Sequence, residues 1–257
     1  MNQQPDVDSH LLESHLRQLY LSSFIRYHET FASEAAQNNH SYSHYLLALA
    51  EQEVLERHAR RRDRRLKEAK IPIVKDLTSF DFTAIPQLNA QKIRQLAQGE
   101  YIDQAEPIIL VGSPGLGKTH IATALAVAAT QQMRRVRFYN AAALVNDLLQ
   151  AQTEGRLTAY LNKALNYQLI VLDELGFIPF TSLGAQVMFQ FCSTLYQRVA
   201  LIITTNLKFA DWTQVFGDER LTVALLDRLT HRAHIIEFIG DSYRFRERQE
   251  RQEAGGE

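Results

Sequence analysis

The chain has 257 residues, of which 46% are hydrophobic and 22% are charged, and its formal net charge is −1. This composition is typical of a globular protein with a sizeable core, and it excludes a disordered chain or a small disulfide-stapled domain. A single cysteine excludes an internal disulfide and a cysteine-rich zinc site, and without a secretory signal or an apolar run of about 18 residues we expect a cytoplasmic protein that does not enter membranes.

The first 70 residues predict a small helical domain. Apolar residues recur at helical spacing within 12–23 and again within 45–55, with a polar turn between them. The near-neutral total charge conceals an asymmetry, because residues 1–56 carry a net charge of −6 and residues 57–70 carry +6. The helical domain therefore ends in one concentrated basic block.

The basic block is predicted as a helix from about Val54 to Glu68 with cationic side chains around most of its circumference. Neutralising several phosphates would give DNA affinity that depends on salt and not on sequence. The block has no interleaved aromatic residues, which favours the duplex backbone over stacking on single strands. A solvated or intersubunit helix is the alternative interpretation. The candidate DNA contacts are Arg57, Arg60, Arg61, Arg62, Arg64, Arg65 and Lys67.

A linker with a proline at each end, residues 71–86, precedes a predicted α/β domain over 87–240. Near-continuous apolar strands separated by helices predict a five-stranded parallel sheet that is covered on both faces. Helices are expected at 119–132 and at 221–234, and residues 241–257 are predicted as a partly disordered tail. The expected strands are 107–111, 136–140, 169–173, 200–206 and 234–238.

The segment after the first of these strands carries a complete phosphate-binding motif. It reads GSPGLGKT, the GxxxxGK[ST] pattern, directly after an apolar strand and at the start of a helix. The glycines let backbone N–H groups converge on phosphates, and the helix N-terminus adds the positive end of its dipole. We expect Lys118 to reach the β- and γ-phosphates of ATP and the Thr119 hydroxyl to coordinate Mg²⁺. The predicted nucleotide contacts are Gly112, Ser113, Pro114, Gly115, Leu116, Gly117, Lys118, Thr119 and His120.

Polar residues end the third and fourth predicted strands. Asp173 terminates a buried strand at the carboxyl edge of the sheet, which places it beside a metal ion held by Thr119. Glu174 follows directly and is predicted to polarise the attacking water as a general base, which favours hydrolysis over simple nucleotide binding. Asn206 is predicted to sense the γ-phosphate or to hold the water, with an N-cap of the next helix as the alternative.

A P-loop, a strand ending in Asp-Glu and a strand ending in TTN together resemble the AAA+ ATPases. The resemblance implies that Asn206 occupies the sensor 1 position. It also implies that the helix before the last strand supplies an arginine finger to a neighbouring subunit, with Arg228 as first choice and Arg232 and Arg220 behind it. Only 19 residues follow Phe238, too few for the helical lid domain of typical AAA+ proteins. We therefore expect a homo-oligomer with composite ATP sites.

Within that superfamily, the segments LIVLDELGFIPF (169–180) and GDERLTVALLDRLTHRAHIIEFIGDSYR (217–244) most closely resemble the IstB-like transposition helpers of bacterial insertion sequences, relatives of the DnaC and DnaI loaders. The resemblance covers about residues 46–246. It implies a nucleoid-associated ATPase that uses ATP and Mg²⁺, assembles on duplex DNA and assists a cognate transposase. It makes Arg244 a candidate second nucleotide sensor, although a tail arginine is the alternative.

Two other functions stay open at this point. A DnaC-like replicative helicase loader would bind a helicase and single-stranded DNA. A nucleotide-dependent scaffold would bind ATP with negligible turnover. Capture of a host helicase would favour the first, and unchanged turnover after loss of Glu174 would favour the second.

Overall fold

The computed structural model describes residues 7–240, so Arg244 and the predicted tail at 241–257 lie outside the described residues. The chain divides into two compact units, residues 1–64 and residues 65–257. The sequence-based domain boundary at residue 70 stays a proposal. Among residues 7–240, no helix combines the length and the apolar character that crossing a bilayer requires.

The N-terminal unit is helical, as expected. Its elements are α1 (Val7–Gln18), α2 (Ser22–Gln37) and α3 (Tyr42–Ala69), of which α3 continues into the second unit. The carboxylate of Glu53 is buried between these helices, where it accepts hydrogen bonds from the Ser23 backbone N–H at 2.7 Å and from Arg57 Nε at 2.6 Å. Burial acts to raise the pKa of Glu53, but these hydrogen bonds outweigh it, and the pKa lies below its ordinary value.

The second unit is built on the predicted five-stranded parallel sheet. The strands run in the order β2-β3-β4-β1-β5, so β3, β4 and β1 are interior and β2 and β5 are the edges. This confirms the α/β fold. The strands are β1 (Ile108–Gly112), β2 (Val136–Asn140), β3 (Leu169–Asp173), β4 (Ala200–Thr205) and β5 (His234–Phe238). The helices are η1 (Phe82–Ala84), α4 (Ala90–Leu96), α5 (Glu100–Asp103), α6 (Lys118–Gln131), α7 (Ala141–Thr153), α8 (Leu157–Ala164), α9 (Ser182–Leu195), η2 (Phe209–Asp211), α10 (Thr213–Phe216) and α11 (Glu219–Thr230).

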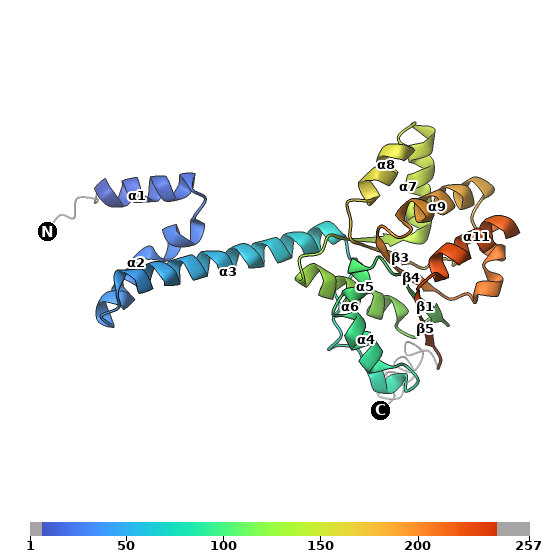
Figure 1. Cartoon of the computed structure of the whole chain (residues 1–257), viewed down its shortest axis with the longest axis horizontal. Coiled ribbons are helices and arrows are strands. Elements are labelled where there is room, and N and C mark those ends of the chain that lie inside the picture. The colour runs from blue at the N-terminus through green and yellow to red at the C-terminus, as the bar shows by residue number, and fades with distance from the viewer. Residues whose placement is uncertain (1–6, 241–257) are drawn as a thin grey trace, which may run out of the picture. The chain divides into compact units, whose positions relative to one another are not determined.

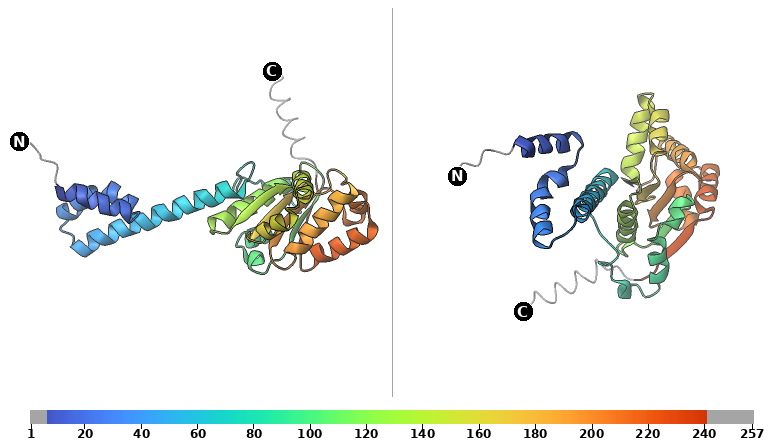
Figure 2. Two further views of the ribbon diagram at one scale, coloured as in Figure 1. Left: turned by 90° about the horizontal axis from the view of Figure 1, so that it is seen from above. Right: turned by 60° about the vertical axis from the view of Figure 1, so that its left-hand side comes forward.

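Helices cover both faces of this sheet (Figure 1 and Figure 2). Successive strand residues point to opposite faces, so Ile109 belongs to one core and Ile108 to the other. Helices α7, α8, α9, α10 and α11 pack on the first face, and α4, α5 and α6 pack on the second. Burial on both faces explains why the strands are apolar along nearly their whole length.

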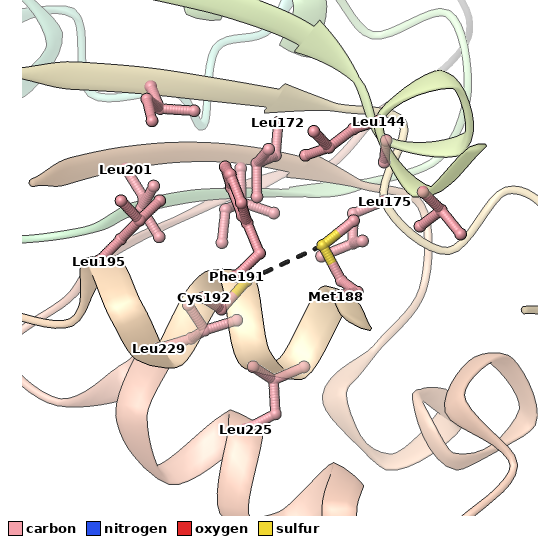
Figure 3. Close-up of a cluster of buried hydrophobic side chains, with 14 of the residues drawn as sticks. Leu144, Leu172, Leu175, Met188, Phe191, Cys192, Leu195, Leu201, Leu225 and Leu229 are labelled. Carbon is pink, nitrogen blue, oxygen red and sulfur yellow. Dashed lines mark hydrogen bonds between the residues drawn. The ribbon is translucent and has the colours of Figure 1, made fainter. Parts of the chain in front are cut away.

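Helix α9 forms the centre of the larger core (Figure 3). Phe191 and Leu195 of this helix lie between the sheet residues, such as Leu201, and Leu225 and Leu229 of α11. The single cysteine, Cys192, is fully buried here and lies 3.9 Å from the sulfur of Met188. Burial raises the pKa of this thiol to about 12, so it acts as a small apolar side chain.

The helix before the last strand differs from the prediction at both ends. Helix α11 begins at Glu219, where the Asp218 side chain accepts a hydrogen bond from the Leu221 N–H at 2.8 Å and caps the helix. It ends at Thr230, and Arg232 then adopts a left-handed backbone with φ of 58°. The turn brings His234 into register with Ile108, so strand pairing with β1 ends the helix four residues early.

Candidate nucleotide site

A cleft of about 660 Å³ opens at the carboxyl edge of the sheet, where the P-loop, the end of β3 and the end of β4 meet. This volume suits a ligand of nucleotide size. Residues distant in the sequence converge here because the carboxyl ends of parallel strands share one edge. From the P-loop and the two strand ends, the cleft is lined by Pro114, Gly115, Leu116, Gly117, Lys118, Thr119, His120, Glu174, Thr204, Thr205 and Asn206.

Two glycines of the P-loop are required by close contacts. A Cβ on Gly112 would lie 2.3 Å from the carbonyl oxygen of Phe238, so only glycine lets the loop leave β1 beside β5. Gly117 has φ of 85°, and a Cβ there would lie 2.7 Å from the Phe80 ring. This left-handed residue precedes α6 and presents the N-terminus of that helix to the cleft.

The Lys118 ammonium is held across the base of the P-loop. It donates to the carbonyl oxygens of Gly112 at 2.6 Å and Ser113 at 2.8 Å, and the residue is largely buried. These two hydrogen bonds hold the ammonium beside the P-loop, where Lys118 lines the cleft. The site thus offers a fixed positive charge and a helix N-terminus to the same anion.

The Thr119 hydroxyl and the Asp173 carboxylate form a pair of oxygen ligands suited to Mg²⁺. Thr119 Oγ1 donates to Asp173 Oδ1 at 2.9 Å, and Thr204 Oγ1 donates to the same oxygen at 2.6 Å. Burial raises the pKa of Asp173, against the opposing effect of these two hydrogen bonds. A hydroxyl and a carboxylate beside a phosphate site are the donor set that Mg²⁺ takes in nucleotide-binding proteins.

Glu174 is exposed in the cleft, one residue beyond the buried Asp173. Its backbone is left-handed with φ of 61°, a conformation that costs a residue with a side chain about 1–2 kcal/mol. The turn is held because the Glu174 N–H donates to Thr204 Oγ1 at 2.9 Å and the Leu175 N–H donates to the Thr204 carbonyl at 2.9 Å. The strained turn points the two neighbouring acids in different directions.

Asn140, at the end of β2, is a site residue that the sequence analysis missed. Its Nδ2 donates to Glu174 Oε2 at 2.8 Å, while its Oδ1 accepts from the N–H groups of Ala142 and Ala143 and caps α7. Only the position of Asn140 at the end of a strand adjacent to β3 could have indicated this contact. The carboxylate of Glu174 is therefore bound to a side chain of the neighbouring strand.

Comparison with known proteins agrees with this geometry. A family model for IstB-like ATP-binding proteins matches residues 14–251. The chain belongs to this family. A relative from Pseudomonas aeruginosa, described as an ATP-binding protein of insertion sequence IS21, is 36% identical over 93% of this chain and 91% of the relative. A relative from Geobacillus stearothermophilus, of insertion sequence IS5376, is 34% identical over 94% of this chain and 96% of the relative.

The fold of this IstB-like chain is shared with AAA+ proteins of DNA replication. The AMPPCP-bound structure of DnaA from Aquifex aeolicus superimposes with a TM-score of 0.56 at 19% identity, over 72% of this chain and 56% of that chain. At 19% sequence identity, this similarity shows that the two proteins share a fold. It confirms the AAA+ fold expected from the P-loop, the strand ending in Asp-Glu and the strand ending in TTN.

The segment between the basic helix and the α/β core forms a further wall of the nucleotide cleft. The Phe80 ring lies against Gly117 and contacts the His120 ring edge-on, with centroids 5.1 Å apart. His120 Nε2 also lies 3.1 Å from the Asp76 carbonyl oxygen. Burial lowers the pKa of His120. Residues of this segment that line the cleft are Pro72, Ile73, Lys75, Ser79, Phe80, Asp81, Ala84 and Ile85.

The structure brings Asn206 into the cleft but places the three candidate finger arginines elsewhere in the described chain. Asn206 follows β4, between β1 and β3, and lines the cleft with Glu174. Arg228 lies in the last turn of α11, where its Nη1 donates to the Ala224 carbonyl at 2.7 Å and its guanidinium lies 5.0 Å from the centre of the Phe189 ring. Arg232 forms an ion pair of 2.8 Å with Glu106, and Arg220 is exposed.

The basic side chains of α3 fall into two groups. Arg57 and Arg60 both form ion pairs with the buried Glu53. Arg57 also donates to the Tyr20 carbonyl at 2.7 Å, and Arg60 donates to Ser22 Oγ at 2.8 Å. Arg65 pairs with Glu68 at 3.3 Å. The exposed basic side chains C-terminal to Arg60 are Arg61, Arg62, Arg64 and Lys67. Arg57 and Arg60 therefore have a structural task within the N-terminal unit.

Proposed function

We propose that this IstB-like chain is a Mg²⁺-dependent ATPase that assembles on duplex DNA and assists the transposase of its insertion sequence. The observation that carries the proposal is the arrangement of Asp173 and Glu174 at the mouth of the P-loop cleft. One acid is buried and bonded to the P-loop hydroxyl of Thr119, and the other is exposed toward the cleft. A buried ligand next to an exposed base is the arrangement that hydrolysis requires.

In this proposal, each group that lines the cleft has a separate role in ATP hydrolysis. The backbone N–H groups around Gly115 and Gly117 and the Lys118 ammonium bind the phosphates and stabilise the charge that develops on them. Thr119 and Asp173 would hold Mg²⁺, which neutralises phosphate charge when bound. Glu174 takes a proton from the attacking water once its carboxylate leaves Asn140, and Asn206 orients that water or the γ-phosphate.

The site is completed by a second subunit in this proposal. Among the described residues, no arginine lines the cleft of its own chain, whereas catalysis on phosphates gains from a cation near the γ-phosphate. Arg228 is half-buried and its guanidinium lies over the Phe189 ring, which restricts the orientation of the side chain. We assign it to the ATP of a neighbouring copy, with Arg232 and Arg220 as the alternatives. Arg244 remains a candidate nucleotide contact.

Duplex DNA is assigned to helix α3. The exposed cations Arg61, Arg62, Arg64 and Lys67, with Arg65, supply a dense positive charge on one helix without aromatic side chains between them. Contacts to phosphates of both strands would then dominate affinity. Arg57 and Arg60 contribute in this assignment by holding α3 against the start of α2 and the turn before it. The transposase is proposed as partner because relatives of this family are described as ATP-binding proteins of insertion sequences.

The first experiment is light scattering after size exclusion, with ATP and Mg²⁺, with and without a duplex of about 50 base pairs, which offers roughly five helical turns. A large assembly that carries DNA and forms only with both ATP and duplex is the expected result. A monomer or dimer that ignores duplex would contradict the proposal. Co-purification of a replicative helicase instead of the cognate transposase would favour the helicase-loader function.

A second experiment separates hydrolysis from nucleotide-dependent scaffolding. Glu174→Gln keeps the size and hydrogen-bonding capacity of the side chain but removes the base. We expect ATP-bound oligomers to persist and hydrolysis to fall by about 100-fold or more, as a positioned base supplies. Unchanged turnover in this variant would remove Glu174 from the mechanism.

A further inference from the structure

Thr204 lies in the interior of the sheet, between the strand that leads into the P-loop and the strand that ends in the two acids. It pairs with Leu110 of β1, and it follows Ile203, the partner of Leu172 on β3. The residue is 2% exposed, so its hydroxyl needs partners within the protein. This position is level with Asp173.

The Thr204 hydroxyl connects the two acidic residues. It donates its hydrogen to Asp173 Oδ1 at 2.6 Å, and it accepts the backbone N–H of Glu174 at 2.9 Å. The backbone N–H can only donate, which fixes the direction of both hydrogen bonds around the hydroxyl. One oxygen atom thus orients the side chain of one acid and the backbone of the next.

The same residue also supports the turn that follows β3. The Thr204 carbonyl accepts the Leu175 N–H at 2.9 Å, so side chain and backbone of Thr204 bind consecutive N–H groups. Between them lies the left-handed backbone of Glu174. Loss of the hydroxyl would leave the Glu174 N–H without this partner and free the strained residue to relax.

At Asp173, the two hydroxyls act on one carboxylate oxygen. Thr119 and Thr204 both donate to Oδ1, so two hydroxyls from different elements fix the position of this oxygen. Without Thr204, the carboxylate could rotate about its side-chain bonds while keeping Thr119. An oxygen that must meet a cation held by Thr119 would then lose its fixed orientation.

We propose that Thr204 is a positioning residue for ATP hydrolysis, which orients the Asp173 carboxylate toward the metal and the Glu174 backbone toward the attacking water. This inference rests on the proposed ATPase function. Thr204 also lines the cleft, but in this role it acts through Asp173 and Glu174 and not through its own contact with phosphate or water. It acts through two residues at once, so its loss should affect both the need for Mg²⁺ and the rate of the chemical step.

Three variants of the full chain test this role. Thr204→Val keeps the branched shape and the preference for a strand but has no hydroxyl. Thr204→Ser restores the hydroxyl without the methyl group. Thr130→Val is the matched control, because Thr130 is equally buried and its hydroxyl donates to the Val127 carbonyl within its own helix, α6. Thermal unfolding establishes that each variant is folded.

Two quantities are measured for each variant: binding of a fluorescent, non-hydrolysable ATP analogue as Mg²⁺ is titrated, and the steady-state kcat for ATP. For Thr204→Val we expect a half-maximal Mg²⁺ concentration about 10-fold higher and a kcat about 10- to 100-fold lower, as for loss of hydrogen bonds to a charged group. Binding of the analogue in EDTA should change by less than about 2-fold, since the phosphate contacts of the P-loop remain. Thr204→Ser should recover most of both losses, and Thr130→Val should match the parent chain.

Wild-type Mg²⁺ dependence and kcat in Thr204→Val would overturn the proposal. Equal losses in Thr204→Ser and Thr204→Val would also overturn it, because the methyl group and not the hydroxyl would then matter. If Thr204→Val bound the ATP analogue more weakly in EDTA, the proposal would also fail, because Thr204 would then support the structure of the P-loop and not the orientation of the acids. Failure of the ATPase function itself is distinguishable, since the parent chain would then show no turnover while the Mg²⁺ titration still reports on Thr204.

Discussion

Asn140 and Glu174 are joined by a hydrogen bond of 2.8 Å between the ends of β2 and β3. The orientation of the Asn140 amide is set by its other end, which caps α7 through the N–H groups of Ala142 and Ala143. The amide therefore presents its NH₂ group to the carboxylate. In this arrangement the proposed base is restrained by a neighbouring strand before any nucleotide binds.

Release of this restraint should raise basal hydrolysis. In Asn140→Ala the Glu174 carboxylate is free to accept a proton from water, and we expect kcat without DNA to rise several-fold, measured by phosphate release. Loss of the cap should also lower the free energy of unfolding by about 1 kcal/mol. Asn140→Ser keeps a capping oxygen, but its shorter side chain cannot cap α7 and reach Glu174 at the same time, so it should show the faster hydrolysis with a smaller loss of stability. Slower hydrolysis in both variants would mean that Asn140 holds the carboxylate in its reactive orientation.

Lys118→Ala should weaken ATP binding and abolish ATP-dependent assembly. The ammonium is the fixed cation of the P-loop, and its loss removes a charge-assisted contact to the phosphates. We expect affinity for a fluorescent ATP analogue to fall by about 10-fold or more, in line with loss of a hydrogen bond to a charged group. Assembly on duplex with ATP should disappear with it. Intact ATP-dependent oligomers in light scattering would refute the coupling of nucleotide to assembly.

The exposed cations of α3 should set the salt dependence of duplex binding. Replacing Arg61, Arg62 and Lys67 with Ala should lower the slope of log affinity against log salt by up to about 3, close to one for each phosphate that the helix no longer neutralises. Basal ATP hydrolysis should not change. Arg134→Ala is the control, because Arg134 is a cation of the α/β unit that is paired with Asp103. An unaltered slope in the triple variant would place the DNA surface elsewhere.

Arg228 can be tested by mixing subunits. Arg228→Ala chains keep intact acidic residues, and Glu174→Gln chains keep an intact arginine, so each variant alone should hydrolyse ATP poorly. If Arg228 serves a neighbouring site, mixtures should regain hydrolysis because some interfaces pair an intact Glu174 with an intact Arg228. The same mixing with Arg232→Ala identifies the finger between the two. Turnover of Arg228→Ala equal to that of the parent chain would exclude it from this role.

The buried Glu53 should make the N-terminal unit sensitive to acid. Its pKa is below the ordinary value in the folded chain, so its contribution to stability is complete above the ordinary glutamate pKa of about 4.3 and is lost as the pH falls toward the folded value. Glu53→Gln should reduce this acid-induced loss of helix content, followed by circular dichroism. A parallel decline in both proteins would show that other carboxylates dominate.

Much of the α/β unit could be predicted because its determinants are local in the sequence. Continuous apolar strands such as Leu169–Asp173 indicate burial on both faces of a sheet, and the P-loop needs its glycines within eight consecutive residues. A helix over about 54–68 and its positive charge were also predictable, whereas α3 itself begins earlier, at Tyr42, because the apolar spacing at 45–55 continues into the same helix. The end of α11 was not predictable, because pairing of His234 with Ile108 competes with continuation of the helix.

The contacts that no sequence pattern could indicate join side chains far apart along the chain. Asn140 and Glu174 are 34 positions apart, and Thr204 lies 31 positions beyond Asp173. No spacing rule connects such residues, since their contact depends on the strand order β2-β3-β4-β1-β5 and on its register. The order of amino acids alone is enough to place a phosphate loop and two acids at one edge of a parallel sheet. The packing of neighbouring strands selects the polar side chains that hold those acids, because a buried carboxylate must be satisfied by whatever donors the adjacent strands place beside it.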